Sequence, residues 1–211
     1  MRTIICIALL AAAPARELIE DKGGVQVWRR DTPGSDFRGI RGAGLVDAPV
    51  RQVALVLLDD AHAPEWVDSL AEARVVRLRG DAEYVEYNRV AMPLFVSDRD
   101  FVTTVSMARD PKARSVTILS EPAPDEEVPR PKGVVRGVLR ASYLLESVDG
   151  GKRTRLTVEI FSDPRGSLPA WLVNFFQKDW ARETIEGIRG QAKKKLQEPA
   201  GFEPFLSTID Y

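Results

Sequence analysis

The stretch DPRGSLPAWLVNFFQKDW, residues 163–180, decides the fold. Ser167 as the cap and Pro169 in the first turn predict the start of a long helix that runs to about Leu196. At 100° per residue its apolar residues share one side: Leu168, Trp171, Leu172, Phe175 and Phe176. This stripe is wider and more aromatic than a helix needs to cover one modest face of a core. The helix is therefore either deeply buried or closes over apolar material that the chain does not supply.

The second half of this helix carries a separate apolar group about a third of a turn away. Its members are Ala181, Ile185, Ile188, Ala192 and Leu196. Gly187 and Gly190 lower the helix propensity of this half. We expect the first half to cover the open end of a sheet and the second half to pack against the flank of that sheet.

The chain before the helix reads as strands. From 71 to 161 it consists of alternating runs separated by turns, and Asp149-Gly150-Gly151 is a strong hairpin signal. Further strands are predicted over 24–31 and 37–46. A long antiparallel meander with helices on one side is an α+β fold.

Several local signals predict helices and ends of helices around these strands. Residues 15–24 read as a short helix stopped by glycines, and Asp47 with Pro49 predicts a helix start. Pro64 would end that helix, and 65–70 would form a short connecting helix. The sequence thus predicts one domain over residues 16–198, followed by a C-terminal tail over 199–211.

The N-terminus has the pattern of an exported protein. A short positive region at Met1-Arg2 precedes the apolar run TIICIALLAAA, and Ala13-Pro14-Ala15 offers small residues for cleavage. We predict a signal peptide over residues 1–15 and an exported protein, periplasmic or secreted. The alternative is a buried first helix in a cytoplasmic protein. Cleavage would remove Cys6, which is the only cysteine of the 211 residues, and with it any disulfide or thiol chemistry.

Composition and charge limit the partners. The formal net charge of −1 gives no surplus of cations for phosphate backbones, so we predict no nucleic-acid partner. The basic run Lys193–Lys195 fits a helix C-terminus, and the alternative is a transient contact with an anionic membrane surface. We expect a monomer without a cofactor.

Strand alternation identifies one candidate wall for an apolar site. In RDFVTTVSM, the bulkier set Phe101, Thr103, Val105 and Met107 shares one face. We predict that this face points inward.

Five motifs, in order, give the sequence a resemblance to a known family. They are DKGGVQVWRRDTPGSDFRGIRG, AHAPEWVDSL, PLFVSDRDFV, PKGVVRGVLR and TRLTVEIFSDPRGSLPAWLVNFF, and together they span most of Arg16 to Leu196. The sequence resembles the START family of lipid-transfer domains. The resemblance implies a helix-grip fold, in which a curved antiparallel sheet wraps a long C-terminal helix that acts as a lid. It also implies one hydrophobic ligand, such as a sterol, a phospholipid or a fatty-acid derivative, carried without chemistry.

The resemblance implies site residues as well. Trp171, Leu172, Phe175 and Phe176 would roof the ligand. In some sterol-binding members an acidic and a basic residue lie in the cavity. The acidic position matches Glu86, whereas the basic position is Val105, so the charged pair of those members is incomplete in this sequence. Glu86 either meets a ligand hydroxyl, holds a water or faces solvent.

Enzymatic alternatives have little support in the sequence. His62 is the only histidine, no nucleophile motif is present, and we predict neither catalytic residues nor a metal site. An aromatase/cyclase-type enzyme on a similar fold remains the alternative. Its candidate groups are Glu86, Thr103, Tyr84, Tyr87 and Tyr143. Within 98–100 we expect an ion pair at the entry of a strand, and we expect Arg136 and Arg140 on a solvated outer face.

Overall fold

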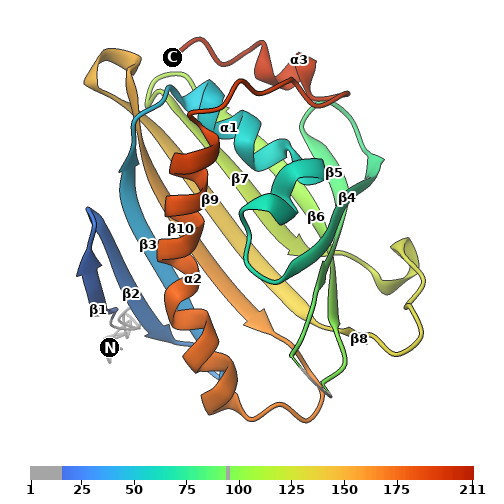
Figure 1. Ribbon diagram of the computed structural model, residues 1–211. Coiled ribbons are helices and arrows are strands. Elements are labelled where there is room, and N and C mark those ends of the chain that lie inside the picture. The colour runs from blue at the N-terminus through green and yellow to red at the C-terminus, as the bar shows by residue number, and fades with distance from the viewer. Residues whose placement is uncertain (1–15, 94–95) are drawn as a thin grey trace, which may run out of the picture.

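A computed structural model describes residues 16–93 and 96–211, apart from the side chains of 170–172 and 175–178 (Figure 1). The predicted signal peptide thus lies outside the described residues. The strands are β1 (Glu17–Lys22), β2 (Val25–Asp31), β3 (Arg38–Val46), β4 (Leu70–Leu78), β5 (Glu83–Val90), β6 (Arg99–Asp110), β7 (Ser115–Pro122), β8 (Val135–Arg136), β9 (Val138–Val148) and β10 (Arg153–Asp163). The helices are α1 (Val50–Leu58), α2 (Ala170–Gln191) and α3 (Glu203–Leu206), with short 3-10 turns η1 (Asp60–Glu65), η2 (Asp125–Glu127) and η3 (Asp149–Gly151).

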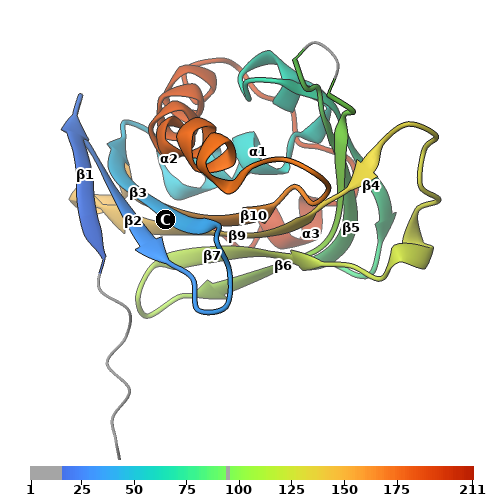
Figure 2. The same cartoon turned by 90° about the horizontal axis from the view of Figure 1, so that it is seen from below.

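One curved sheet organises the molecule. Its order is β1-β2-β3-β10-β9-β7-β6-β5-β4, with antiparallel pairing throughout this path, and β8 joins β6 in parallel. The sheet curls around α1 and α2, which lie on its concave side (Figure 2). The fold is α+β and of the helix-grip type, as the sequence predicts, and Asp149–Gly151 forms the turn of the β9–β10 hairpin.

Glycines bring the second half of α2 close to the sheet. Helix α2 lies against β2, β3 and β10, and Ala181, Ile185 and Ile188 are fully buried there. A Cβ atom on Gly42 of β3 would lie only 2.8 Å from the Cβ of Ala181. The contact is therefore possible because β3 carries no side chain at this point.

The C-terminal segment completes the core rather than forming a separate tail. Helix α3 lies beside α1 at one end of the sheet (Figure 1). Its apolar side chains are buried: Phe202, Phe205, Leu206 and Ile209. The ring of Phe202 meets that of Tyr84 edge to face, with centroids 5.0 Å apart. The prediction of a tail overlooked a signal in the sequence, because Phe202, Phe205, Leu206 and Ile209 follow the i, i+3, i+4, i+7 spacing of a buried helical face.

Several local predictions were also wrong. Residues 17–22 form β1 and not a helix, because Gly23-Gly24 turn the chain into a hairpin with β2. Helix α1 has Pro49, not Asp47, at its N-cap, and it ends at Leu58, before Pro64. The predicted connecting helix over 65–70 is replaced by η1 and the start of β4.

The long helix differs from its prediction at both ends. Pro169 stands at the N-cap position of α2 without a side-chain cap, so Ser167 is not its cap. Helix α2 ends at Gln191, so Lys193–Lys195 follow the helix rather than forming its last turn. No helix among the described residues is long and apolar enough to cross a bilayer.

A buried ion pair fixes the entry of β6. Arg136 of β8 donates to both carboxylate oxygens of Asp100, at 2.8 and 2.9 Å, and a third hydrogen bond reaches the carbonyl of Val128. Asp100 is fully buried and Arg136 nearly so. An ion pair is present at this strand entry, but it joins Asp100 to Arg136 rather than to a residue within 98–100, and the prediction that Arg136 is solvated was wrong. Parallel pairing of β8 with β6 places the two side chains together.

Candidate functional site

The central part of the concave face carries a small polar cluster within an apolar wall. Strands β5 and β6 pair so that Glu86 stands opposite Thr103, and the Thr103 hydroxyl donates to Glu86 Oε2 at 3.1 Å. Val105 and Met107 follow on the same face of β6 and are buried in the main core beside α1 and α2. Phe101 precedes them and is also buried. The face that strand alternation assigned to the interior thus points inward, and Glu86 points with it.

A second carboxyl group approaches Glu86 from the opposite side. Asp60 belongs to η1, which packs against β4 over the concave face. Only 7% of Asp60 is exposed, and its Oδ2 atom is buried without a hydrogen-bond partner. Burial, followed by the negative charge of Glu86, raises the pKa of Asp60 well above its ordinary value. The two groups therefore form a carboxyl pair that favours retention of a proton.

The pKa of Glu86 is raised for a related reason. Burial is the largest cause, and hydrogen bonds with Asn88, Thr103 and Asp60 oppose it. Within the described part of the chain, no Arg or Lys contributes to the pKa of either carboxyl group. Glu86 nevertheless keeps some accessible surface, as does Asn88 on the same face of β5. Among the residues described, the two carboxyl groups of Asp60 and Glu86 therefore have no cationic side chain as a partner.

Two tyrosines complete the surroundings of the pair. Burial raises the pKa of Tyr84 and of Tyr143, and the charge of Glu86 raises both further. Both phenols therefore stay neutral at physiological pH. Tyr87, the third tyrosine singled out from the sequence, lies on the outer face with Val85 and Val102, and Arg74 stacks on its ring at 4.7 Å. It takes no part in the cluster.

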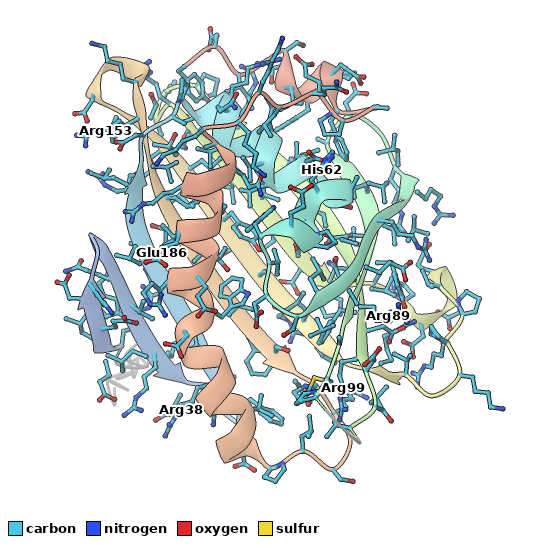
Figure 3. The ribbon with its side chains drawn as sticks, in the orientation of Figure 1. Arg38, His62, Arg89, Arg99, Arg153 and Glu186 are labelled. Carbon is cyan, nitrogen blue, oxygen red and sulfur yellow. The ribbon has the colours of Figure 1, made fainter. Side chains whose placement is uncertain are left out.

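Arg99 anchors the loop that leads into α2. It lies at the same end of the sheet as Arg38 and the start of α2 (Figure 3). Its guanidinium donates to the carbonyl oxygens of Pro164 at 3.1 Å, Arg165 at 3.2 Å and Ser97. Burial lowers the pKa of Arg99. The side chain thus ties β6 to the loop that enters α2.

The first half of α2 is anchored on its other side by Asn174. The Asn174 side chain accepts a hydrogen bond from the main-chain N–H of Arg38 and donates to the carbonyl of Asp36, both at 3.1 Å. Val173 is buried, and Trp180 packs against the main core. The predicted roof residues belong to this half of α2, but their side chains lie outside those described. They are Trp171, Leu172, Phe175 and Phe176.

Asp60 was not identified from the sequence as a residue of the site, nor were Val173 and Trp180 identified as buried and partly buried residues of α2. Asp60 stands among other polar residues of the DDAHAPEW segment, and nothing in the local pattern marks it as buried. Trp180 lay outside both apolar groups of the helix. His62, by contrast, is exposed at η1 (Figure 3) and bonds Asp59 through Nδ1 at 2.8 Å. Among the residues described, no three His, Cys, Asp or Glu side chains converge as metal ligands.

Comparison with known proteins agrees with this architecture. A family model described as the START domain matches residues 19–195. The chain therefore belongs to the START domain family, and the resemblance of its five motifs is confirmed.

Individual relatives and structures give the same result. The phosphatidylcholine transfer protein of Mus musculus is 27% identical over 146 residues, which cover 66% of this chain and 67% of that protein. An uncharacterised Pseudomonas aeruginosa protein is 27% identical over 205 residues, 92% of this chain and all of its own. The crystal structure of a STAR-related lipid transfer protein fragment from Xanthomonas axonopodis superposes with a TM-score of 0.76 at 26% identity, covering 85% of this chain and 99% of that one.

Proposed function

We propose that this protein binds one hydrophobic lipid between the concave face of its sheet and helix α2 and carries it between membranes without chemistry. The observation that carries the proposal is the concave wall itself. Phe101, Val105 and Met107 make it apolar, and Glu86 with Thr103 gives it a polar group. An apolar wall with a few converging polar groups is the usual make-up of a site for an amphiphilic ligand.

Transfer requires that the ligand can enter. Helix α2 is packed tightly on β3 through Ala181 and Gly42 in its second half. Its first half is attached through Arg99 and Asn174, which bond mainly to loop carbonyls. We propose that this first half moves to admit lipid, with Trp171, Leu172, Phe175 and Phe176 as the roof over the ligand.

Membrane contact is a further part of the proposal. Lys193, Lys194 and Lys195 are exposed beyond the end of α2, although Lys194 also bonds Glu65 at 3.0 Å. Cations at such a position attract anionic lipid surfaces weakly. These lysines support transient contact with membranes, and the signal peptide predicted over residues 1–15 is the basis for proposing a carrier that works outside the cytoplasm.

The test is native mass spectrometry of protein purified from its own host, followed by extraction and identification of the bound molecule. We expect one lipid per chain and movement of that lipid from donor to acceptor vesicles. Protein that is empty and takes up no sterol, fatty acid or phospholipid would contradict the carrier function. An aromatase/cyclase-type activity would then become the alternative to assay.

Two adjacent threonines supply a matched pair of variants. Thr103 faces the concave side, whereas Thr104 is half-buried on the outer face. Thr103→Phe should lower the amount of bound lipid because the ring occupies the space beside Glu86. Thr104→Phe should leave lipid binding unchanged. Circular dichroism of both variants shows whether they fold.

A further inference from the structure

The carboxyl groups of Asp60 and Glu86 together have fewer hydrogen-bond donors around them than they can accept. Asp60 is buried and comes from η1, while Glu86 is half-buried and comes from β5. The residues that hydrogen-bond to Glu86 are Thr103 and Asn88, and Asp60 can join them only when one carboxyl group carries a proton. Without that proton, Asp60 Oδ2 is an acceptor without a donor.

Such an orphan acceptor is costly inside a protein. A buried polar atom without a hydrogen bond has lost its bonds to water without replacement, and the loss is greater for a charged group. No water-filled surface relieves it, because Asp60 is more than nine-tenths buried. The site thus gains from a ligand that brings hydrogen-bond donors and positive charge together.

The titratable groups that face the pair are negative or neutral, so they all favour a cationic ligand end. Asp59 adds negative charge beside Asp60, while Tyr84 and Tyr143 are neutral phenols close to Glu86. Among the described residues, none that acts on the pair is cationic. An anionic ligand end would be repelled here, and a quaternary ammonium would bring charge without an N–H donor.

We propose that Asp60 and Glu86 select lipids whose polar end is a primary or secondary ammonium group, with Asp60 as the residue that sets this preference. The proposal rests on the carrier function, because it assumes that the polar end of the bound lipid reaches the concave face. It goes beyond the pattern of the sterol-binding members, where an acidic residue faces a basic one. In this protein a second acid takes part, and the basic position is occupied by Val105.

The experiment compares four single-chain amphiphiles of equal chain length, titrated below their critical micelle concentrations. They are an alkyl primary amine, its trimethylammonium analogue, the alcohol and the carboxylate. Since a hydrogen bond to a charged group contributes about 1.5–3 kcal/mol, we expect the amine to bind on the order of tenfold to hundredfold more tightly than the alcohol. The carboxylate should bind most weakly.

Variants and pH give independent measurements. Asp60→Asn should reduce the amine-to-alcohol ratio to near one. Asp68→Asn, which makes the same change at an exposed position of the same connection, should keep the ratio. In the wild type, affinity for the amine should rise with pH as the pair loses its proton, whereas affinity for the alcohol should stay level.

The outcomes separate this proposal from the carrier function. Equal binding of amine and alcohol by the wild type, or an unchanged ratio in a folded Asp60→Asn variant, overturns the ammonium preference and leaves the carrier function standing. Failure of all four amphiphiles and of natural lipids to bind overturns the carrier function itself. If Asp60→Asn does not fold, the wild-type panel and its pH dependence still decide the proposal.

Discussion

Two glycines of α2 provide a sharp test of how this helix is seated. Gly187 and Gly190 are three residues apart, and neither has a positive φ. A Cβ atom on Gly187 would lie 2.7 Å from Trp66 Cε3 and 3.1 Å from the Trp66 carbonyl oxygen. A Cβ atom on Gly190 would meet nothing within 4 Å. The same substitution should therefore have opposite effects on stability at the two positions.

The magnitudes follow from two competing contributions. Replacing Gly by Ala in a helix gains about 1 kcal/mol, and somewhat less near the end of the helix. Gly190→Ala should raise the free energy of unfolding by about 0.5–1 kcal/mol. At Gly187 the overpacking against Trp66 costs about 1–3 kcal/mol, which outweighs the gain. Gly187→Ala should therefore be destabilised, by up to about 2 kcal/mol.

The assay is urea unfolding followed by circular dichroism, with melting temperatures as a second readout. For a chain of this size, 1 kcal/mol corresponds to about 2–4 °C. The midpoints of the two variants should lie on opposite sides of the wild type, with unchanged slopes. Equal stabilisation of both would refute the reasoning, since it would mean that Trp66 is not held against α2.

Three other predictions concern the core and the carboxyl pair. Arg136→Met should lower the free energy of unfolding by about 3–5 kcal/mol, because Asp100 is left as an unpaired buried carboxylate. Adding Asp100→Leu in the same chain should recover most of this loss, and a double variant as unstable as the single one would contradict the explanation. Phe202→Ala should cost about 3–5 kcal/mol by opening a cavity beside Tyr84, whereas a true tail would tolerate the change without loss in thermal unfolding. Asp60→Asn should flatten the pH dependence of stability. The pKa of Asp60 is raised in the folded state, so its contribution is fully present below the unfolded value of about 4 and is lost as the pH rises through the folded pKa. Relative to wild type, the variant should thus gain stability from pH 4 to pH 8 in denaturant titrations, and a constant difference across that range would rule out this titration.

Local periodicity was enough to predict most of the sheet. The alternation in RDFVTTVSM placed Thr103, Val105 and Met107 on one face, and the structure buries them on the concave side. The runs between 71 and 161 became strands because each has two distinct faces. Alternation alone did not show which way the Glu86 side chain points. The pairing of Glu86 with Thr103 shows it, because residues opposite each other on paired strands lie on the same face of the sheet.

Elements whose local signals compete were less predictable. Glu17–Lys22 has helix-forming residues and a glycine stop, yet pairing with β2 makes it a strand. Arg136 looks like a surface residue in sequence, and only β8 pairing with β6 brings it to Asp100. In the first case pairing with the next strand outweighs the local helix preference, and in the second the partner, Asp100, lies 36 residues away in the chain.

The sequence by itself determined the fold class, the inward face of β6, the hairpin at Asp149–Gly151 and the family. Only the tertiary structure decided that Asp60 faces Glu86, that Trp66 fills the space left by Gly187, and that Phe202 is core. The physical reason is that a period along the chain reports which face of an element is apolar. Which two faces meet depends on packing between segments that are remote in sequence, where a single glycine or a single buried carboxyl group settles the arrangement.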